Sequence, residues 1–169
     1  ENKPGIPSSL RLALPQGTGI SRNQAIRLLR TVLEALRRHG TVTAFLREQP
    51  YYQEFKRYAT TALGLKEIFD QPGLKRAFTA GEARMELVLS SRGPEDLLRG
   101  EISCDCTALS DPSFYNTVPQ FLLDPGFLNF KVMQDGRWVG NLYLLVAEQE
   151  GKPALIIDAV QLAPWRPAW

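Results

Sequence analysis

A turn signal between two apolar runs limits most strongly what this chain can fold into. Asp135-Gly136 separates residues 130–133 from residues 138–147, and both runs are rich in apolar residues. A two-residue hairpin turn needs positive φ at both positions, which Asp and Gly tolerate, so the pair predicts a β-hairpin. A polar turn then leads into a third apolar run, residues 154–162. We therefore expect an antiparallel β-meander near the end of the chain.

The third run is almost entirely apolar. Strands that are buried on both faces have this composition, so residues 154–162 are predicted to form a central strand of the sheet. Asp158 is the single acid inside the run. Its side chain is the clearest candidate for chemistry in a chain that offers few others.

Helix signals fill most of the first half of the sequence. Ser21 and Gln24 fit a capping box, and apolar residues then recur at helical spacing until Gly40, a residue suited to end a helix. Thr41 and Pro50 are suited to begin the next two helices. Residues 21–80 are therefore expected to be a compact run of helices. The shorter helices within it are predicted over residues 65–69 and 74–80.

After residue 82 the pattern becomes alternating, which indicates strands. We expect an α+β fold, in which an N-terminal helical bundle precedes a mixed domain whose sheet is an antiparallel β-meander. The boundaries are an extended arm over residues 1–20, a helical region over 21–81 and the sheet domain over 82–169. Within the last, we expect a strand over 84–90, a short helix over 94–98 and a long irregular connection over 101–128, which is either functional or contains short helices.

Composition excludes several classes of protein. The chain is 44% hydrophobic and 22% charged, and no apolar run approaches the roughly 20 residues that span a bilayer, so we expect no membrane segment. Cys104 and Cys106 indicate no disulfide framework, and no secretory leader is visible. These features favour a soluble, cytoplasmic protein. The sequence begins at Glu1 rather than Met, so it is expected to be a processed piece or an excerpt of a longer protein.

Residues 129–166 resemble the middle of an acyl-CoA-dependent N-acetyltransferase of the GNAT superfamily. The matching features are the Asp135-Gly136 turn, the strand that contains Gly140, and the run from Asp158 that ends in Pro164-Trp165-Arg166. The strand and helix predicted over residues 84–98 are similar to the start of that fold. The resemblance implies an enzyme that uses acetyl-CoA as its acyl donor.

The resemblance also implies site residues. Backbone groups of Val160, Gln161 and Leu162 would bind the pantetheine amides of the cofactor, and Arg166 matches the residue that begins the phosphate-binding loop of the family. Asp158 would be the general base, because desolvation in an apolar strand favours the protonated form of a carboxylate. The alternative for Asp158 is structural, as a partner of a neighbouring amide or an outward-pointing residue. The sequence departs from the family pattern after Arg166, where Pro167-Ala168-Trp169 stands in place of a glycine loop.

The cysteines and the single histidine do not predict a metal site. Zinc needs about four ligands, and Cys104, Cys106 and His39 are one short. A nucleophilic cysteine would require His39 nearby, but His39 lies near the end of a predicted helix in the other region. We expect two partly buried thiols in a turn, a histidine that complements the helix C-terminus, and no metal.

Two other functions remain open. A non-catalytic interaction or structural module, acting on a protein partner or as a homodimer, is indicated by Trp138, Trp165 and Trp169, since Trp is enriched at interfaces. Nucleic-acid binding is a lesser alternative, because residues 1–82 carry thirteen Lys/Arg against seven Asp/Glu. We expect nucleic acid to be an unlikely partner, since the aromatic residues of that region have the spacing of a buried helix stripe. They are Tyr51, Tyr52, Phe55 and Tyr58.

Overall fold

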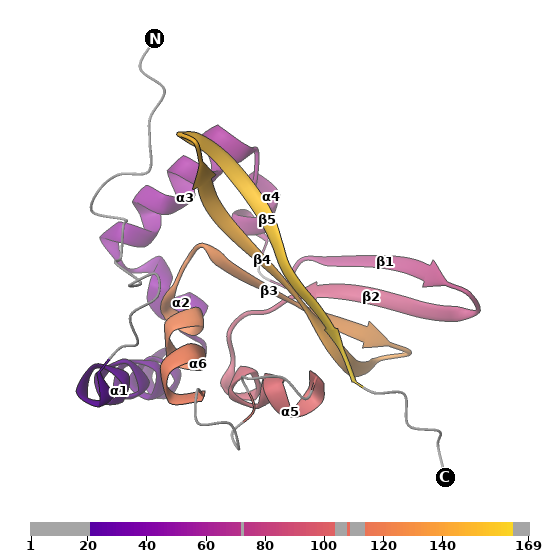
Figure 1. The fold of residues 1–169 in the computed structure, drawn as a ribbon, viewed down its shortest axis with the longest axis horizontal. Coiled ribbons are helices and arrows are strands. Elements are labelled where there is room, and N and C mark those ends of the chain that lie inside the picture. The colour runs from indigo at the N-terminus through magenta and orange to yellow at the C-terminus, as the bar shows by residue number, and fades with distance from the viewer. Residues whose placement is uncertain (1–20, 72, 104–107, 109–113, 164–169) are drawn as a thin grey trace.

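The structure, a computed structural model, describes residues 21–71, 73–103, 108 and 114–163. Within them the chain forms helices and one antiparallel sheet, which confirms the α+β fold class. The five strands of this sheet follow the order β1-β2-β3-β4-β5, so each pairs with its neighbour in sequence (Figure 1). Their bounds are β1 (Lys75–Ala80), β2 (Ala83–Leu89), β3 (Phe127–Gln134), β4 (Arg137–Gln149) and β5 (Lys152–Leu162). The arm expected over residues 1–20 lies outside the described residues.

The predicted hairpin turn is confirmed. Asp135 and Gly136 have φ of 50° and 80° and join β3 to β4, with Gln134 opposite Arg137. These positive values are the ones that a two-residue hairpin turn requires. The meander predicted for the end of the chain is therefore present, and two further strands extend it on the β3 side.

The helices before the sheet begin and end close to their predicted positions. Ser21 and Gln24 form the capping box of α1, and Gly40 ends that helix in the left-handed region with φ of 74°. The Thr41 side chain caps α2, and Pro50 is the first residue of α3. The bounds are α1 (Arg22–His39), α2 (Val42–Arg47), α3 (Pro50–Leu63) and α4 (Lys66–Asp70).

The helix predicted over residues 74–80 is wrong, because Lys75–Ala80 is strand β1. Gly81, with φ of 63°, allows a two-residue turn that places Ala80 opposite Ala83. A helix this short is marginal by itself, whereas pairing along β2 satisfies the backbone groups of the whole segment. The helical region therefore ends at Asp70, and the sheet begins before the boundary expected at residue 82.

The connection predicted to be irregular over residues 101–128 contains helical segments. The short helix predicted over residues 94–98 is confirmed as a 3₁₀ helix, η2 (Pro94–Leu98), which continues directly into α5 (Arg99–Ser103), and α6 (Phe114–Leu123) precedes β3. Val118 and Leu122 of α6 are buried in the core, and α6 packs against α1. Cys104 and Cys106 lie outside the described residues.

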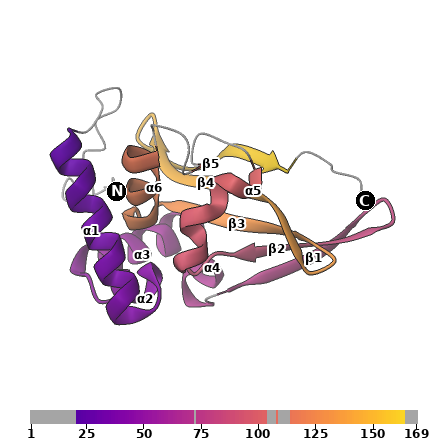
Figure 2. The same cartoon turned by 90° about the horizontal axis from the view of Figure 1, so that it is seen from below.

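Each face of the sheet contacts a different set of elements. Leu128 and Phe130 of β3 belong to the main hydrophobic core, which includes residues of α1, α2, α3, α4 and α6. The alternate residues Phe127 and Asn129 point to the other face, where Phe127 stacks on Phe121 of α6 and Asn129 bonds η2. Figure 2 shows α1, α2 and α3 beside one end of the sheet, while the β1–β2 hairpin extends away from them.

The prediction that residues 154–162 form a central strand buried on both faces is wrong. β5 pairs only with β4 among the described residues and lies at one margin of the sheet, with β1 at the other (Figure 2). The reason is topological: in a meander, the strand added after the last turn becomes an edge, whatever its composition. Among the helices described, none is long and apolar enough to cross a membrane.

Candidate functional site

β5 is the strand on which the predicted site residues lie, and its backbone is irregular at one point. Ile157 pairs with Leu144 and Ala159 pairs with Tyr143, so Asp158 has no partner residue in β4. This is a β-bulge, in which two residues of one strand oppose one residue of the other. Bulges bend the strand and redirect a side chain, and they occur often beside active sites. The bulge thus separates Asp158 from the regular alternation of β5.

Asp158 is exposed and makes no ion pair or side-chain hydrogen bond with another residue that the structure describes. The premise of its predicted role was desolvation inside a buried strand. In this structure the carboxylate is open to solvent, so burial in the strand does not desolvate it and that premise is wrong.

The other residues predicted to bind the cofactor differ in how exposed they are. Val160 and Leu162 are 60% and 55% exposed, and Gln161 is half-buried with its side-chain oxygen 3.5 Å from the Ser103 hydroxyl. The structure therefore brings Asp158, Val160 and Leu162 together on an accessible strand, with Gln161 turned toward α5. Arg166 lies outside the described residues.

The exposed side chains of β5 form one apolar face. Leu155, Ile157, Val160 and Leu162 are 41–67% exposed, and they oppose alternate residues of β4, so all four point to the same side of the sheet. Their β4 neighbours on that side are partly buried hydrophobic residues that pack against the core, namely Leu142, Leu144 and Val146. The apolar face of β5 is thus an uncovered continuation of the hydrophobic core.

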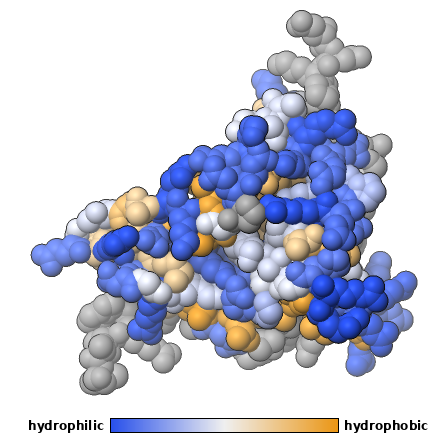
Figure 3. Space-filling model, turned by 180° about the vertical axis from the view of Figure 1, so that it is seen from behind, coloured by the Kyte–Doolittle hydropathy of each residue, from blue (hydrophilic) through white to orange (hydrophobic). Residues whose placement is uncertain are grey.

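Across the reverse side of the molecule, hydrophilic residues predominate, and hydrophobic ones form separate areas between them (Figure 3). Large apolar side chains exposed elsewhere among the described residues, such as Ile26, Leu33 and Phe78, belong to different elements. β5 is the described element with the most exposed large hydrophobic residues. An exposed apolar edge strand of this kind marks a place where a ligand or another chain binds.

A buried polar network holds α5 against β4 and β5. The side-chain amide of Asn141 donates to the Ser103 hydroxyl at 3.1 Å and to the Arg99 carbonyl at 3.3 Å. The Arg99 guanidinium is buried, with its central carbon 5.2–5.5 Å from the ring centroids of three aromatic residues, Phe121, Phe127 and Tyr143. This network joins α5 to β4.

A second buried network centres on Asp96. Its carboxylate accepts hydrogen bonds from the Ser90 hydroxyl at 2.6 Å, the Gly93 amide at 3.0 Å and the Asn129 amide at 3.2 Å. The Lys131 ammonium lies 3.4 Å away. Neither network was predicted from the sequence, because their members are far apart along the chain. Asparagines inside apolar strands were the one available signal.

The residues considered for other roles are paired or buried within the chain. The His39 imidazole lies 3.3 Å from a Glu48 carboxylate oxygen. Trp138 is half-buried and donates to the Gly140 carbonyl, with the Lys131 ammonium 4.6 Å from its ring centroid. Tyr52, Phe55 and Tyr58 are buried in α3, so they do not provide exposed stacking surfaces for bases. Trp165 and Trp169 lie outside the described residues.

No group of three or more His, Cys, Asp or Glu residues that could hold a metal ion occurs within the part of the chain that the structure describes. No protein-family model, no curated protein and no solved structure matches this chain. The site itself therefore has to carry any functional proposal.

Proposed function

We propose that the chain is an N-acyltransferase-like domain that uses an acyl-CoA donor, with β5 as its cofactor-binding strand and Asp158 as its general base. The observation that carries the proposal is the β-bulge at Asp158 on a strand whose outer edge is open among the described residues. The resemblance of residues 129–166 to acyl-CoA-dependent N-acetyltransferases supports the same assignment.

The backbone of β5 is suited to an extended ligand with amide groups. An edge strand presents N–H and C=O groups that point away from its single neighbour. An extended chain that carries amides can pair with these groups in the manner of an added strand. The pantetheine arm of coenzyme A is such a chain, and Val160, Gln161 and Leu162 are the backbone positions proposed to bind it.

Asp158 lies at the bulge and is exposed, which supports its proposed role as the base that meets an acceptor amine. In the proposed reaction the amine nitrogen attacks the thioester carbonyl, so that the C–N bond forms and the C–S bond breaks. Asp158 accepts the proton of the amine, and the sulfur leaves as the thiolate of coenzyme A. A donor that lies over β5 would also remove water from the carboxylate, which favours its uptake of a proton.

Thermal unfolding with millimolar acetyl-CoA tests this function. A ligand at about 100 times its dissociation constant adds roughly 2.7 kcal/mol to the free energy of unfolding. For a chain of this size that increase corresponds to a rise of roughly 5–10 °C in Tm. The control is the same concentration of adenosine diphosphate, which lacks the pantetheine arm. A Tm that does not respond to acetyl-CoA would contradict the proposal.

A second candidate function is a protein-interaction module, and the exposed apolar face of β5 favours it. The occupant proposed is a second copy of the chain, because β5 is complementary to itself in one register. If two β5 strands pair antiparallel with Leu155 on the twofold axis, Lys152 of each copy stands opposite Asp158 of the other. Opposite charges at paired positions stabilise such an arrangement, and the symmetry forms the contact twice.

A charge exchange tests the second candidate. Lys152→Glu should weaken the dimer measured by sedimentation equilibrium, because two pairs of like charges then face each other. The double variant Lys152→Glu/Asp158→Lys should restore it. A wild-type chain that remains monomeric at high concentration, or a double variant no tighter than Lys152→Glu, excludes this register.

A further inference from the structure

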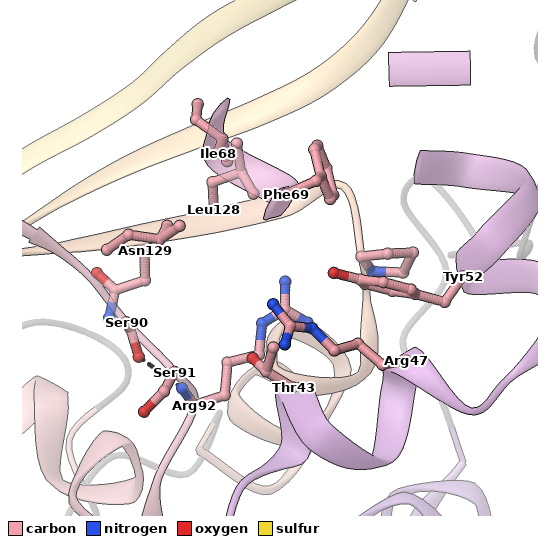
Figure 4. A pocket seen from close by; sticks show the side chains of 12 residues that line it. Thr43, Arg47, Tyr52, Ile68, Phe69, Ser90, Ser91, Arg92, Leu128 and Asn129 are labelled. Carbon is pink, nitrogen blue, oxygen red and sulfur yellow. Dashed lines mark hydrogen bonds between the residues drawn. The ribbon is translucent and has the colours of Figure 1, made fainter. Parts of the chain in front are cut away.

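A pocket away from β5 lies where α2, α3 and α4 approach the ends of β2 and β3. Its polar lining includes Thr43 and Arg47 of α2, Tyr52 of α3, and Ser91 and Arg92 of the segment after β2. Figure 4 shows the side chains of Arg47 and Arg92 extending toward the middle of this pocket. Two guanidinium groups with hydroxyl groups around them form a surface rich in hydrogen-bond donors.

Arg92 is held rigidly in the pocket wall. The residue is buried, and its backbone lies in the left-handed region with φ of 59°. The guanidinium donates to the Leu122 carbonyl at 2.8 Å and to the Phe127 carbonyl at 2.7 Å. An arginine has five N–H donors, so these two bonds fix the orientation of the group and leave further donors for the pocket.

Arg47 supplies a positive charge that is not balanced locally. Its side chain is half-buried and forms no hydrogen bond or ion pair with any residue that the structure describes. Arg92, in contrast, interacts electrostatically with the carboxylates of Asp124 and Asp96. Asp124 therefore provides Arg92 with a counter-charge, whereas no carboxylate pairs with Arg47 among the described residues. An anion in the pocket would therefore meet an arginine without a carboxylate partner among the described residues.

Tyr52 adds a hydroxyl group to the polar lining of the pocket. The residue is only 5% exposed, yet its hydroxyl has no hydrogen-bond partner among the described residues. Figure 4 shows this oxygen directed into the pocket, toward the two guanidinium groups. Water reaches this oxygen, which is not one of the shielded side-chain atoms without a partner, so the hydroxyl can donate to an acceptor in the pocket. An oxyanion held by Arg47 would provide that acceptor.

The opposite wall of the pocket is apolar and is formed by Ile68, Phe69, Leu89 and Leu128. We propose that this pocket binds a small organic anion, whose oxyanion head lies on Arg47, Arg92 and Tyr52 and whose compact apolar body lies against the apolar wall. Carboxylates and phosphate monoesters share this head chemistry, because both accept charge-assisted hydrogen bonds from arginine. The site is separate from β5 and does not depend on the function proposed for it.

Binding of three simple probes tests the proposal. Acetate, butyrate and inorganic phosphate are titrated against the full chain by calorimetry, at constant ionic strength with chloride as the reference anion. Butyrate that binds more tightly than acetate identifies a carboxylate ligand with an apolar body, whereas tighter phosphate identifies a phosphate ester. Absence of binding by all three probes overturns the proposal.

Three variants locate the binding. Arg47→Gln should weaken the best probe about tenfold or more, since a hydrogen bond to a charged group is lost. Tyr52→Phe keeps the shape of the core and should weaken binding a few-fold, and Arg47→Lys should restore part of the loss because it restores the charge. The matched control is Arg57→Gln, which removes an exposed arginine of α3 and should leave binding unchanged. Equal effects of Arg47→Gln and Arg57→Gln would mean that the anion binds by general charge alone, which also overturns the site.

Discussion

The Ser90 hydroxyl donates a 2.6 Å hydrogen bond to the carboxylate of Asp96, and both residues are buried. The bond joins the end of β2 to η2, and the same carboxylate accepts from the side chain of Asn129 in β3. One buried acid therefore connects the sheet to the helical segment that packs on it.

Replacing that acid should destabilise the fold strongly. Asp96→Ala leaves the Ser90 hydroxyl and the Gly93 and Asn129 amides without their acceptor. The expected loss in the free energy of unfolding is about 3–5 kcal/mol, measured by urea denaturation. The control is Glu95→Gln, which removes a half-exposed partner of Lys131 and should cost less than about 1 kcal/mol. Equal losses in the two variants would mean that the buried network is not what connects these elements.

The close contact between Gly140 and β5 predicts that a methyl group added at Gly140 separates the end of β5 from β4. A Cβ at Gly140 would lie 2.3 Å from the Gln161 carbonyl and 2.9 Å from the Leu162 Cα, both of them backbone atoms. Gly140→Ala should therefore displace the end of β5 and accelerate hydrogen exchange of the β5 amides. Gly151→Ala, where the added Cβ meets nothing within 4 Å but φ is 73°, should cost about 1–2 kcal/mol through backbone strain and leave the far end of β5 protected. Protection at residues 159–162 that persists in Gly140→Ala would contradict the structure there.

The role proposed for Asp158 predicts a separation of binding from turnover. The carboxylate is exposed, so Asp158→Asn should leave stability and the acetyl-CoA-dependent rise in Tm unchanged. The rate of thiol release from acetyl-CoA with an amine acceptor should fall about 100-fold or more, as general bases contribute. Glu150→Gln, in the turn between β4 and β5, is the control and should keep full activity. If Asp158→Asn retained the wild-type rate, Asp158 would not be the general base.

The ion pairs of Asp70 predict a pH-dependent contribution to stability. Hydrogen bonds from the Lys56 and Lys66 ammonium groups lower the pKa of Asp70 from 3.8 to about 2. A carboxyl whose pKa is lower in the folded state stabilises the fold above its unfolded pKa, and that contribution is lost as pH falls from about 4 to about 2. Asp70→Asn should lower the urea midpoint at pH 7, and the difference from wild type should narrow across this acidic range. Glu82→Gln, which alters an exposed acid of the β1–β2 turn, should show no such narrowing.

Features that depend on local chemistry follow from neighbouring residues in the sequence. The capping box at Ser21, the left-handed Gly40 and the Asp135-Gly136 turn all lie where residue type alone requires them. Each depends on the φ preferences and hydrogen bonds of a few consecutive residues, so a short stretch of sequence is enough to predict it. The fold class followed from the same signals.

The position of β5 at the edge of the sheet and the grouping of distant polar residues depend instead on long-range contacts. The composition of β5 predicts a buried strand, but its position depends on how many strands pair beyond it, which no local pattern records. The helix expected over residues 74–80 became β1 for the same reason, because pairing with β2 outweighed a weak local preference. Arg47, Tyr52 and Arg92 are up to 45 residues apart in the sequence, and only the packing of α2 and α3 against the sheet places them in one pocket.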